Sequence, residues 1–254
     1  FPYTTLFRST AAILSAAMLL DHLGRPEDAE RVEAAVAGGI PIIKSLRQGL
    51  AANRIERVYG ILNGTCNFIL TTMRETGREF ADVLAEAQAL GYAEADPSFD
   101  VDGVDAAHKL ALLAALAFGG RPRFDAIEIE GIRHVSAVDI AFADQLGYRI
   151  KLLGVAQMTG RGLEQRMSPC LVPCDSPLGQ LEGGTNMVVV EGDSVGQIVL
   201  RGAGAGEGPT ASAVMSDVVE LARGVRMPVF GHFKAIDADT LLGVMNGKLE
   251  PYFG

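Results

Sequence analysis

Between residues 125 and 200 the sequence consists of short segments with strand-forming character, separated by glycine, proline, aspartate and serine. Runs of this kind, bounded by turn-forming residues, are typical of β-strands. The segments are AIEIEGI at 126–132, YRIKLLGVAQM at 148–158, GLEQRMSPCLV at 162–172, NMVVVEG at 186–192 and GQIVLRG at 196–202. They predict an α/β (α+β) fold with a mixed, largely antiparallel sheet layered with helices.

The residues before 125 alternate between helical patterns and turns. Residues 11–37 favour two helices broken at Gly24 and Pro26, because Pro-Glu-Asp is a usual helix start. A short helix is expected to end near Gly49. The segment 55–64 predicts a strand that enters a tight turn at Asn63-Gly64, followed by a helix that ends at Gly77.

Two further helices flank a segment rich in carboxylates. Residues 79–91 predict an amphipathic helix, whose apolar stripe is Phe80, Val83, Leu84, Ala87 and Leu90. Residues 105–118 predict a largely buried helix, and the segment between these two helices is expected to be a loop. Near the other end, a glycine-rich loop runs into a long helix at 202–223, whose N-terminus could face an anion.

Composition excludes several classes of partner. The net charge is −9 without a cluster of lysine or arginine, so nucleic acid is not an expected partner. The apolar run at 110–118 is about half of the roughly 20 residues that span a bilayer, and no membrane span is predicted. Cys66, Cys170 and Cys174 lack metal-ligand spacing, so they indicate reduced thiols in a cytoplasmic protein and no zinc site.

The segment GYAEADPSFDVDGVDAAHK at 91–109 holds five carboxylates and ends on a lysine. The carboxylates are Glu94, Asp96, Asp100, Asp102 and Asp105. One interpretation is a solvated turn, because Asp, Pro, Ser and Gly are ordinary turn residues. Two features favour a site instead: Asp105 and Lys109 are four apart and share a helix face, and that helix is apolar afterwards.

A lysine beside several carboxylates can form a structural ion pair, or it can relay protons if desolvation lowers its pKa. The sequence leaves both roles for Lys109 open. Spare carboxylates suit a ligand that carries an ammonium group, so an amino-acid substrate fits. The glycine run GAGAGEGPT at 202–210 allows a loop that touches a cofactor, but it lacks the βαβ context of a full dinucleotide site.

The acidic segment resembles the signature of the homoserine dehydrogenase family. The matching residues are Ala87, Gly91, Tyr92, Asp96, Pro97, Asp100, Val101, Gly103, Asp105 and Lys109. The runs EAAVAGGIPIIKSLRQGLAANRI, GILNGTCNFILTTM, LGYRIKLLGVAQ and GAGAGEGPTASAV are similar to the same family. The resemblance extends from about Glu33 to the end of the sequence.

The resemblance implies interconversion of L-homoserine and L-aspartate 4-semialdehyde with NADP or NAD, in threonine and methionine biosynthesis. Lys109 would exchange the proton of the C4 hydroxyl. Substrate would be held by Glu94 and Asp105, helped by Tyr92, Asp100, Gly64 and Thr65, and Gly206 would approach the cofactor. Asp96 and Asp102 would cap and shape the loop.

The resemblance further implies a monovalent cation site, Na or K, and a homodimer. The cation would be bound by Glu33 and by the backbone carbonyls of Val36, Gly38 and Ile40. Two alternatives remain: a non-catalytic dimerisation module, and a fragment of isopropylmalate dehydrogenase fused to an unrelated tail.

The domain organisation predicted from these resemblances has four parts. They are a non-native leader at 1–10, a helical segment at 11–37, a catalytic and dimerisation domain at 38–200, and a glycine-rich loop with helices at 201–254 that would return to a nucleotide-binding domain. In this family a Rossmann domain should precede Glu33. Residues 11–36 instead resemble the C-terminal helices of isopropylmalate dehydrogenase, and the two resemblances meet at EAAVA, 33–37. We interpret the chain as a chimera without a complete Rossmann domain, and we expect it to be an incomplete or inactive fragment of a homoserine dehydrogenase.

Overall fold

Strands β3 (Tyr148–Thr159) and β4 (Gly162–Pro173) form a long hairpin in the computed structural model, which describes residues 39–224. This hairpin belongs to a six-stranded sheet with the order β2-β4-β3-β1-β5-β6. The other strands are β1 (Ile55–Ile61), β2 (Glu128–Ile129), β5 (Thr185–Gly192) and β6 (Gly196–Ala203). Every pair is antiparallel except β2 with β4. The predicted mixed, largely antiparallel sheet is therefore confirmed.

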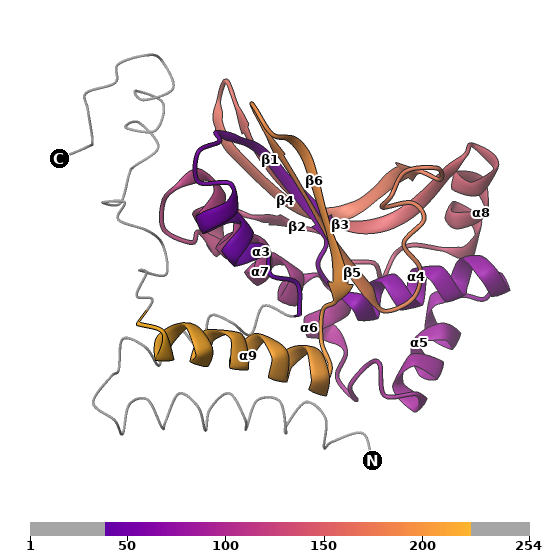
Figure 1. Cartoon of the computed structure of the whole chain (residues 1–254). Helices are drawn as coiled ribbons and strands as arrows, with labels where there is room; N and C mark the ends of the chain where they lie inside the picture. The colour runs from indigo at the N-terminus through magenta and orange to yellow at the C-terminus, as the bar shows by residue number, and fades with distance from the viewer. Residues whose placement is uncertain (1–38, 225–254) are drawn as a thin grey trace.

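Helices pack against this sheet and around its ends (Figure 1). They are α3 (Ile42–Lys44), α4 (Gly64–Thr76), α5 (Phe80–Ala89), α6 (Ser98–Val101), α7 (Val104–Phe118), α8 (Ala137–Gln145) and α9 (Glu207–Ala222). A π-helical turn at Ser45–Gly49 follows α3, and a 3-10 turn at Phe124–Ala126 precedes β2. None of the helices in the described part of the chain combines the length and apolar character that crossing a bilayer requires.

Helix α7 packs against the centre of the sheet. Its Leu110 is fully buried, and a side chain added at Gly154 of β3 would lie 3.3 Å from Leu110. The glycine thus leaves the space that the leucine needs to approach the sheet. The buried face of α7 confirms the largely buried helix predicted at 105–118. It also fixes the first two turns of α7, which carry Asp105 and Lys109.

Strand β1 leads directly into α4 through Asn63. This residue has extended backbone angles, and its side-chain oxygen accepts a hydrogen bond from the Cys66 N–H at 2.9 Å, which is the geometry of an N-cap. Helix α4 ends at Gly77, whose φ of +67° suits glycine. The strand and helix were predicted correctly, but the tight turn at Asn63-Gly64 was wrong because Asn63 starts the helix itself.

Other local predictions need correction. The stripe on α5 is buried at Val83 and Ala87, but Leu90 is exposed because the helix ends at Ala89 and the chain turns at Gly91. The acidic segment is not a loop throughout, since it contains α6.

The strand predicted at 126–132 is only two residues long. A Cβ at Gly131 would lie 2.3 Å from the Val101 carbonyl oxygen, so the chain leaves the sheet to pack on α6. Helix α8 was not predicted, although its capping box, Ser136 with Asp139, was a signal. The helices predicted at 11–37 lie outside the described residues.

Candidate functional site

Lys109 lies in a network of polar groups at the start of α7. Its Nζ donates to Asp105 Oδ2 at 2.8 Å and to the Leu62 carbonyl oxygen at 3.2 Å. The predicted pairing of Asp105 with Lys109 is confirmed, and about a quarter of each side chain is exposed. The ammonium group is therefore fixed by two acceptors and still reaches solvent, as a group that exchanges protons with a ligand must.

Asn63 connects two carboxylates of the acidic segment, Asp100 and Asp105. Its Nδ2 donates to Asp100 Oδ1 at 2.8 Å and to Asp105 Oδ2 at 2.9 Å. One amide thus caps α4 with its oxygen and bridges two carboxylates with its nitrogen. Sequence reasoning missed Asn63 because Asn-Gly indicates a turn.

Asp100 is the carboxylate of the Lys109 network whose pKa the fold raises. Burial raises its pKa, and the charge of Asp105 acts in the same direction, while the Asn63 hydrogen bond opposes both. A bound cation would reverse this cost. Next to it, burial raises the pKa of the Cys66 thiol well above its usual value, so Cys66 is an inert packing group and no nucleophile.

Tyr92, Gly64 and Thr65 come together at the N-terminus of α4. The Thr65 hydroxyl donates to the Tyr92 carbonyl at 2.9 Å, and the half-exposed Tyr92 ring stacks on Phe68 with centroids 4.2 Å apart. A Cβ at Gly64 would lie 2.5 Å from the Gly184 carbonyl oxygen. Only glycine fits this contact. Tyr92, Gly64 and Thr65, which were predicted to bind the substrate, therefore lie together on one surface.

The remaining carboxylates differ in their roles. Glu94 is exposed, and within residues 39–224 its carboxylate forms no hydrogen bond to the Lys109 network. Asp96 accepts the Ser98 N–H at 3.1 Å, and hydrogen bonds from Ser98 lower its pKa. Asp102 pairs with Arg133. The last two therefore shape the acidic segment, as predicted.

Asn186 connects the Lys109 network to the glycine-rich segment. It is 5% exposed, and its Nδ2 donates to the Leu62 carbonyl oxygen at 3.1 Å, the same oxygen that Lys109 uses. A Cβ at Gly204 would lie 2.0 Å from that nitrogen. Gly206, two residues on, has a φ of +119°. Asn186 could not be predicted from local pattern, because its partner Leu62 is 124 residues away along the chain.

The described residues fit only part of a dinucleotide site. Within them the glycine-rich segment precedes α9, but the single parallel pair, β2 with β4, forms no βαβ unit. Glu207 in the first turn of α9 also disfavours an anion there. The predicted anion site at this helix start therefore has no support in the geometry, and Gly206 remains a predicted contact.

The predicted cation ligands are mostly outside the described residues, as Glu33, Val36 and Gly38 are. The Ile40 carbonyl accepts the Ile42 N–H at 2.8 Å. A carbonyl oxygen has a second lone pair, so this hydrogen bond leaves room for a cation.

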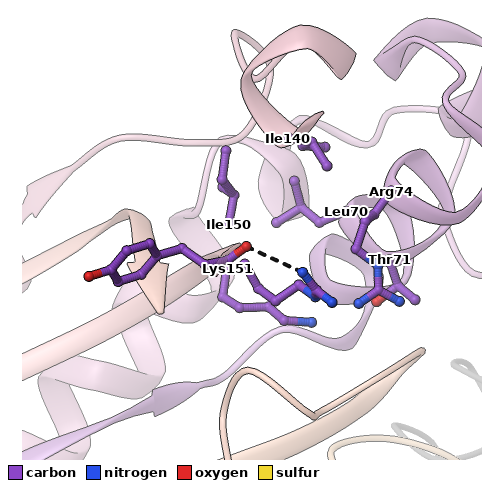
Figure 2. Close-up of a pocket in the computed structure, with 8 residues that line it drawn as sticks. Leu70, Thr71, Arg74, Ile140, Ile150 and Lys151 are labelled. Atoms are coloured by element: carbon purple, nitrogen blue, oxygen red, sulfur yellow. Dashed lines mark hydrogen bonds between the residues drawn. The ribbon is translucent and has the colours of Figure 1, made fainter. Parts of the chain in front are cut away.

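A small pocket on another side of α4 surrounds Lys151 of β3 (Figure 2). Leu70, Thr71 and Arg74 of α4 line it. Burial lowers the pKa of Lys151 to about 8. None of the predicted site residues lines this pocket, so the sequence analysis missed it.

Comparison with known proteins agrees with the signature at 87–109. A sequence model of the family described as homoserine dehydrogenase matches residues 41–219. The homoserine dehydrogenase of Neisseria gonorrhoeae is 58% identical over 219 residues, which is 86% of this chain and 48% of that protein. That of Pseudomonas aeruginosa is 58% identical over 191 residues, covering 75% and 44%.

Solved structures give the same answer. A homoserine dehydrogenase from Thiobacillus denitrificans has a TM-score of 0.73 at 55% identity, over 74% of this chain and 43% of that one. A hyperthermophilic archaeal homoserine dehydrogenase in complex with NADPH has a TM-score of 0.62 at 31% identity, over 75% and 54%. The chain belongs to the homoserine dehydrogenase family, a family of oxidoreductases. It spans about half the length of the curated relatives it matches.

We predict a pH-dependent contribution of Lys151 to stability. Its folded pKa of about 8 lies below the ordinary 10.5, so between these values the unfolded state binds more protons. The free energy of unfolding should therefore rise with pH in this window, by up to about 1.4 kcal/mol per pH unit.

The measurement is urea unfolding of the wild type and Lys151→Met at about pH 7.5 and about pH 9.5, where the wild type should gain about 1 to 2 kcal/mol relative to the variant. An equal change in both proteins would mean that Lys151 has an ordinary pKa.

Proposed function

We propose that this chain carries the substrate-binding and proton-transfer part of a homoserine dehydrogenase. The reaction is the interconversion of L-homoserine and L-aspartate 4-semialdehyde. The observation that carries the proposal is the network in which Lys109 contacts Asp105 at 2.8 Å while Asn63 bridges Asp105 and Asp100. It places a proton carrier beside paired carboxylates, which an amino-acid alcohol requires.

Lys109 is the proton carrier in this proposal. Two acceptors hold its ammonium group, so its third hydrogen is available to the C4 oxygen of the substrate. During oxidation the neutral amine takes the hydroxyl proton as the C–O bond becomes a carbonyl, and during reduction the ammonium returns it. NADP or NAD, when bound, accepts or supplies the hydride.

The carboxylates bind the ammonium group of homoserine. Asp100 and Asp105 are held side by side by Asn63, and a cation between them offsets the cost that burial imposes on Asp100. Glu94 stands at the exposed rim near Tyr92 and closes on the substrate from outside. Gly64 and Thr65 complete this surface.

Three further parts of the proposal rest on the family resemblance. A monovalent cation is bound by Glu33, Val36, Gly38 and Ile40, and Gly206 approaches the cofactor. The chain works in the cytoplasm, which agrees with its free cysteines.

Steady-state reduction of NADP with L-homoserine at alkaline pH tests the function. Any turnover that the wild type shows should fall by about 100-fold or more in Lys109→Ala, because the proton then has no carrier. Lys44→Ala is the matched control, since Lys44 pairs with Glu220 away from this network, and it should keep full activity.

The pattern of failure is informative. If the wild type binds homoserine without turnover, only the substrate-binding part of the proposal stands. Neither turnover nor binding would contradict it and favour the non-catalytic dimerisation module.

We also propose a homodimer formed through the sheet face opposite α7. A row of apolar side chains crosses this face on neighbouring strands: Val155, Tyr59, Val189 and Val199. Val199 of β6 is 40% exposed, whereas Val189 of β5 is already buried at 2% exposure, so a second copy would contact Val199 rather than Val189. The polar side chains next to this row already bind each other, as Arg57 does with Glu191. A second copy would therefore pack on apolar side chains without leaving these charges unpaired.

Sedimentation velocity tests the dimer. The wild type should sediment at twice the mass of the 26.8 kDa chain, and Val199→Asp should sediment as a monomer because its charge would be buried without a partner. Val138→Asp on α8, where the valine is 58% exposed, is the control that should remain dimeric. A monomeric wild type would contradict the dimer.

A further inference from the structure

Lys151 is the one charged residue among the buried polar residues in the described range, at 2% exposure. It projects from β3 toward α4, where Figure 2 shows it beside Thr71 and Arg74. A lysine in this position costs free energy unless acceptors compensate it. None of the reaction steps above uses Lys151, so its contacts point to another role.

The contacts of Lys151 converge on the segment 181–184, which precedes β5. Its Nζ donates to the Leu181 carbonyl at 2.6 Å and to Asn67 Oδ1 at 2.9 Å. Asn67 in turn donates to the carbonyls of Leu181 at 3.2 Å and Gly183 at 2.8 Å. Lys151 and Asn67 thus hold this backbone together, and they share the Leu181 carbonyl oxygen as an acceptor.

A surface ion pair reinforces the same attachment. Arg74 of α4 binds both carboxylate oxygens of Glu182 at 2.9 Å. Three side chains from α4 and β3 therefore hold three consecutive residues, Leu181 to Gly183. The segment has no regular helix or strand of its own, so its position depends on these contacts together with the fully buried side chain of Leu181.

The end of this segment touches the proposed substrate surface. A Cβ at Gly184 would lie 3.3 Å from the Tyr92 ring, and one at Gly64 would lie 2.5 Å from the Gly184 carbonyl oxygen. The segment therefore forms the wall behind Tyr92 and Gly64. Because Gly184 leaves no room for a side chain at Gly64 and packs closely on the Tyr92 ring, a shift of this wall would change the surroundings of both residues.

We propose that Lys151 is a positioning residue: together with Asn67 it holds residues 181–184 against Tyr92 and Gly64 and so sets the affinity for the amino-acid substrate. This inference rests on the proposed function of the Tyr92 surface. Lys151 acts through Asn67 and the backbone and does not touch the substrate.

The test combines hydrogen exchange by mass spectrometry with L-homoserine titration calorimetry on the full chain. Lys151→Met removes the ammonium donor at nearly constant length. We expect faster exchange in peptides that cover 181–186 and Tyr92, unchanged exchange in β1, and homoserine binding weakened by about tenfold or more, because the wall is displaced.

A second variant separates positioning from folding. Asn67→Asp keeps the acceptor for Lys151 but loses both donations to the segment, so it should show the same faster exchange and weaker binding in a folded protein. Thr71→Val is the matched control, because Thr71 lines the same pocket and its hydroxyl has no partner among the described residues. It should bind homoserine like the wild type.

The outcomes separate the two proposals. If Lys151→Met and Asn67→Asp bind homoserine as tightly as the wild type, or if exchange at 181–186 is unchanged, the positioning role is wrong. A wild type that does not bind homoserine contradicts the proposed function instead, while the exchange data still report on the attachment of the segment.

Discussion

The side-chain amide of Asn63 is the interaction on which the candidate site depends. Its oxygen starts α4, and its nitrogen joins Asp100 of α6 to Asp105 of α7. Because two like charges would otherwise repel each other, a neutral donor between them is what keeps the carboxylates together. Three helices therefore meet at one amide. The position of Lys109 follows, since Asp105 is its closest acceptor.

Contacts with the sheet hold this arrangement in place. Leu110 of α7 packs on β3 at Gly154. The carbonyl oxygen of Leu62, just after β1, accepts hydrogen bonds from both Lys109 and Asn186. Asn186 and Lys151 are buried polar groups whose bonds reach between elements. Such groups are costly when unpaired, so each one restricts the structure to the arrangement that satisfies it.

The sequence predicted what depends on local pattern. Strand-forming runs bounded by turn residues predicted the long strands. The spacing of Asp105 and Lys109 predicted their ion pair, because one helical turn brings them together. The strand predicted at 126–132 shortens to the two residues of β2, because packing on α6 outweighs the strand pattern near Gly131. Helix α8 was missed although its capping box was present in the sequence. Asn186 and Lys151 were missed for another reason: their partners are 124 residues away for Asn186 and 30 and 84 for Lys151, and no local pattern records them. Asn63 was read as a turn residue, and its carboxylate partners, 37 and 42 residues away, left no local signal either.

The most direct measurement of the central claim is L-homoserine binding by calorimetry to the wild type and Asn63→Ser. Serine caps a helix as well as asparagine does, so α4 should still form and the protein should fold, whereas the bridge between Asp100 and Asp105 is lost. The account predicts that the variant binds homoserine about tenfold or more weakly, which corresponds to about 1.4 kcal/mol. Equal affinity in the two proteins would contradict it.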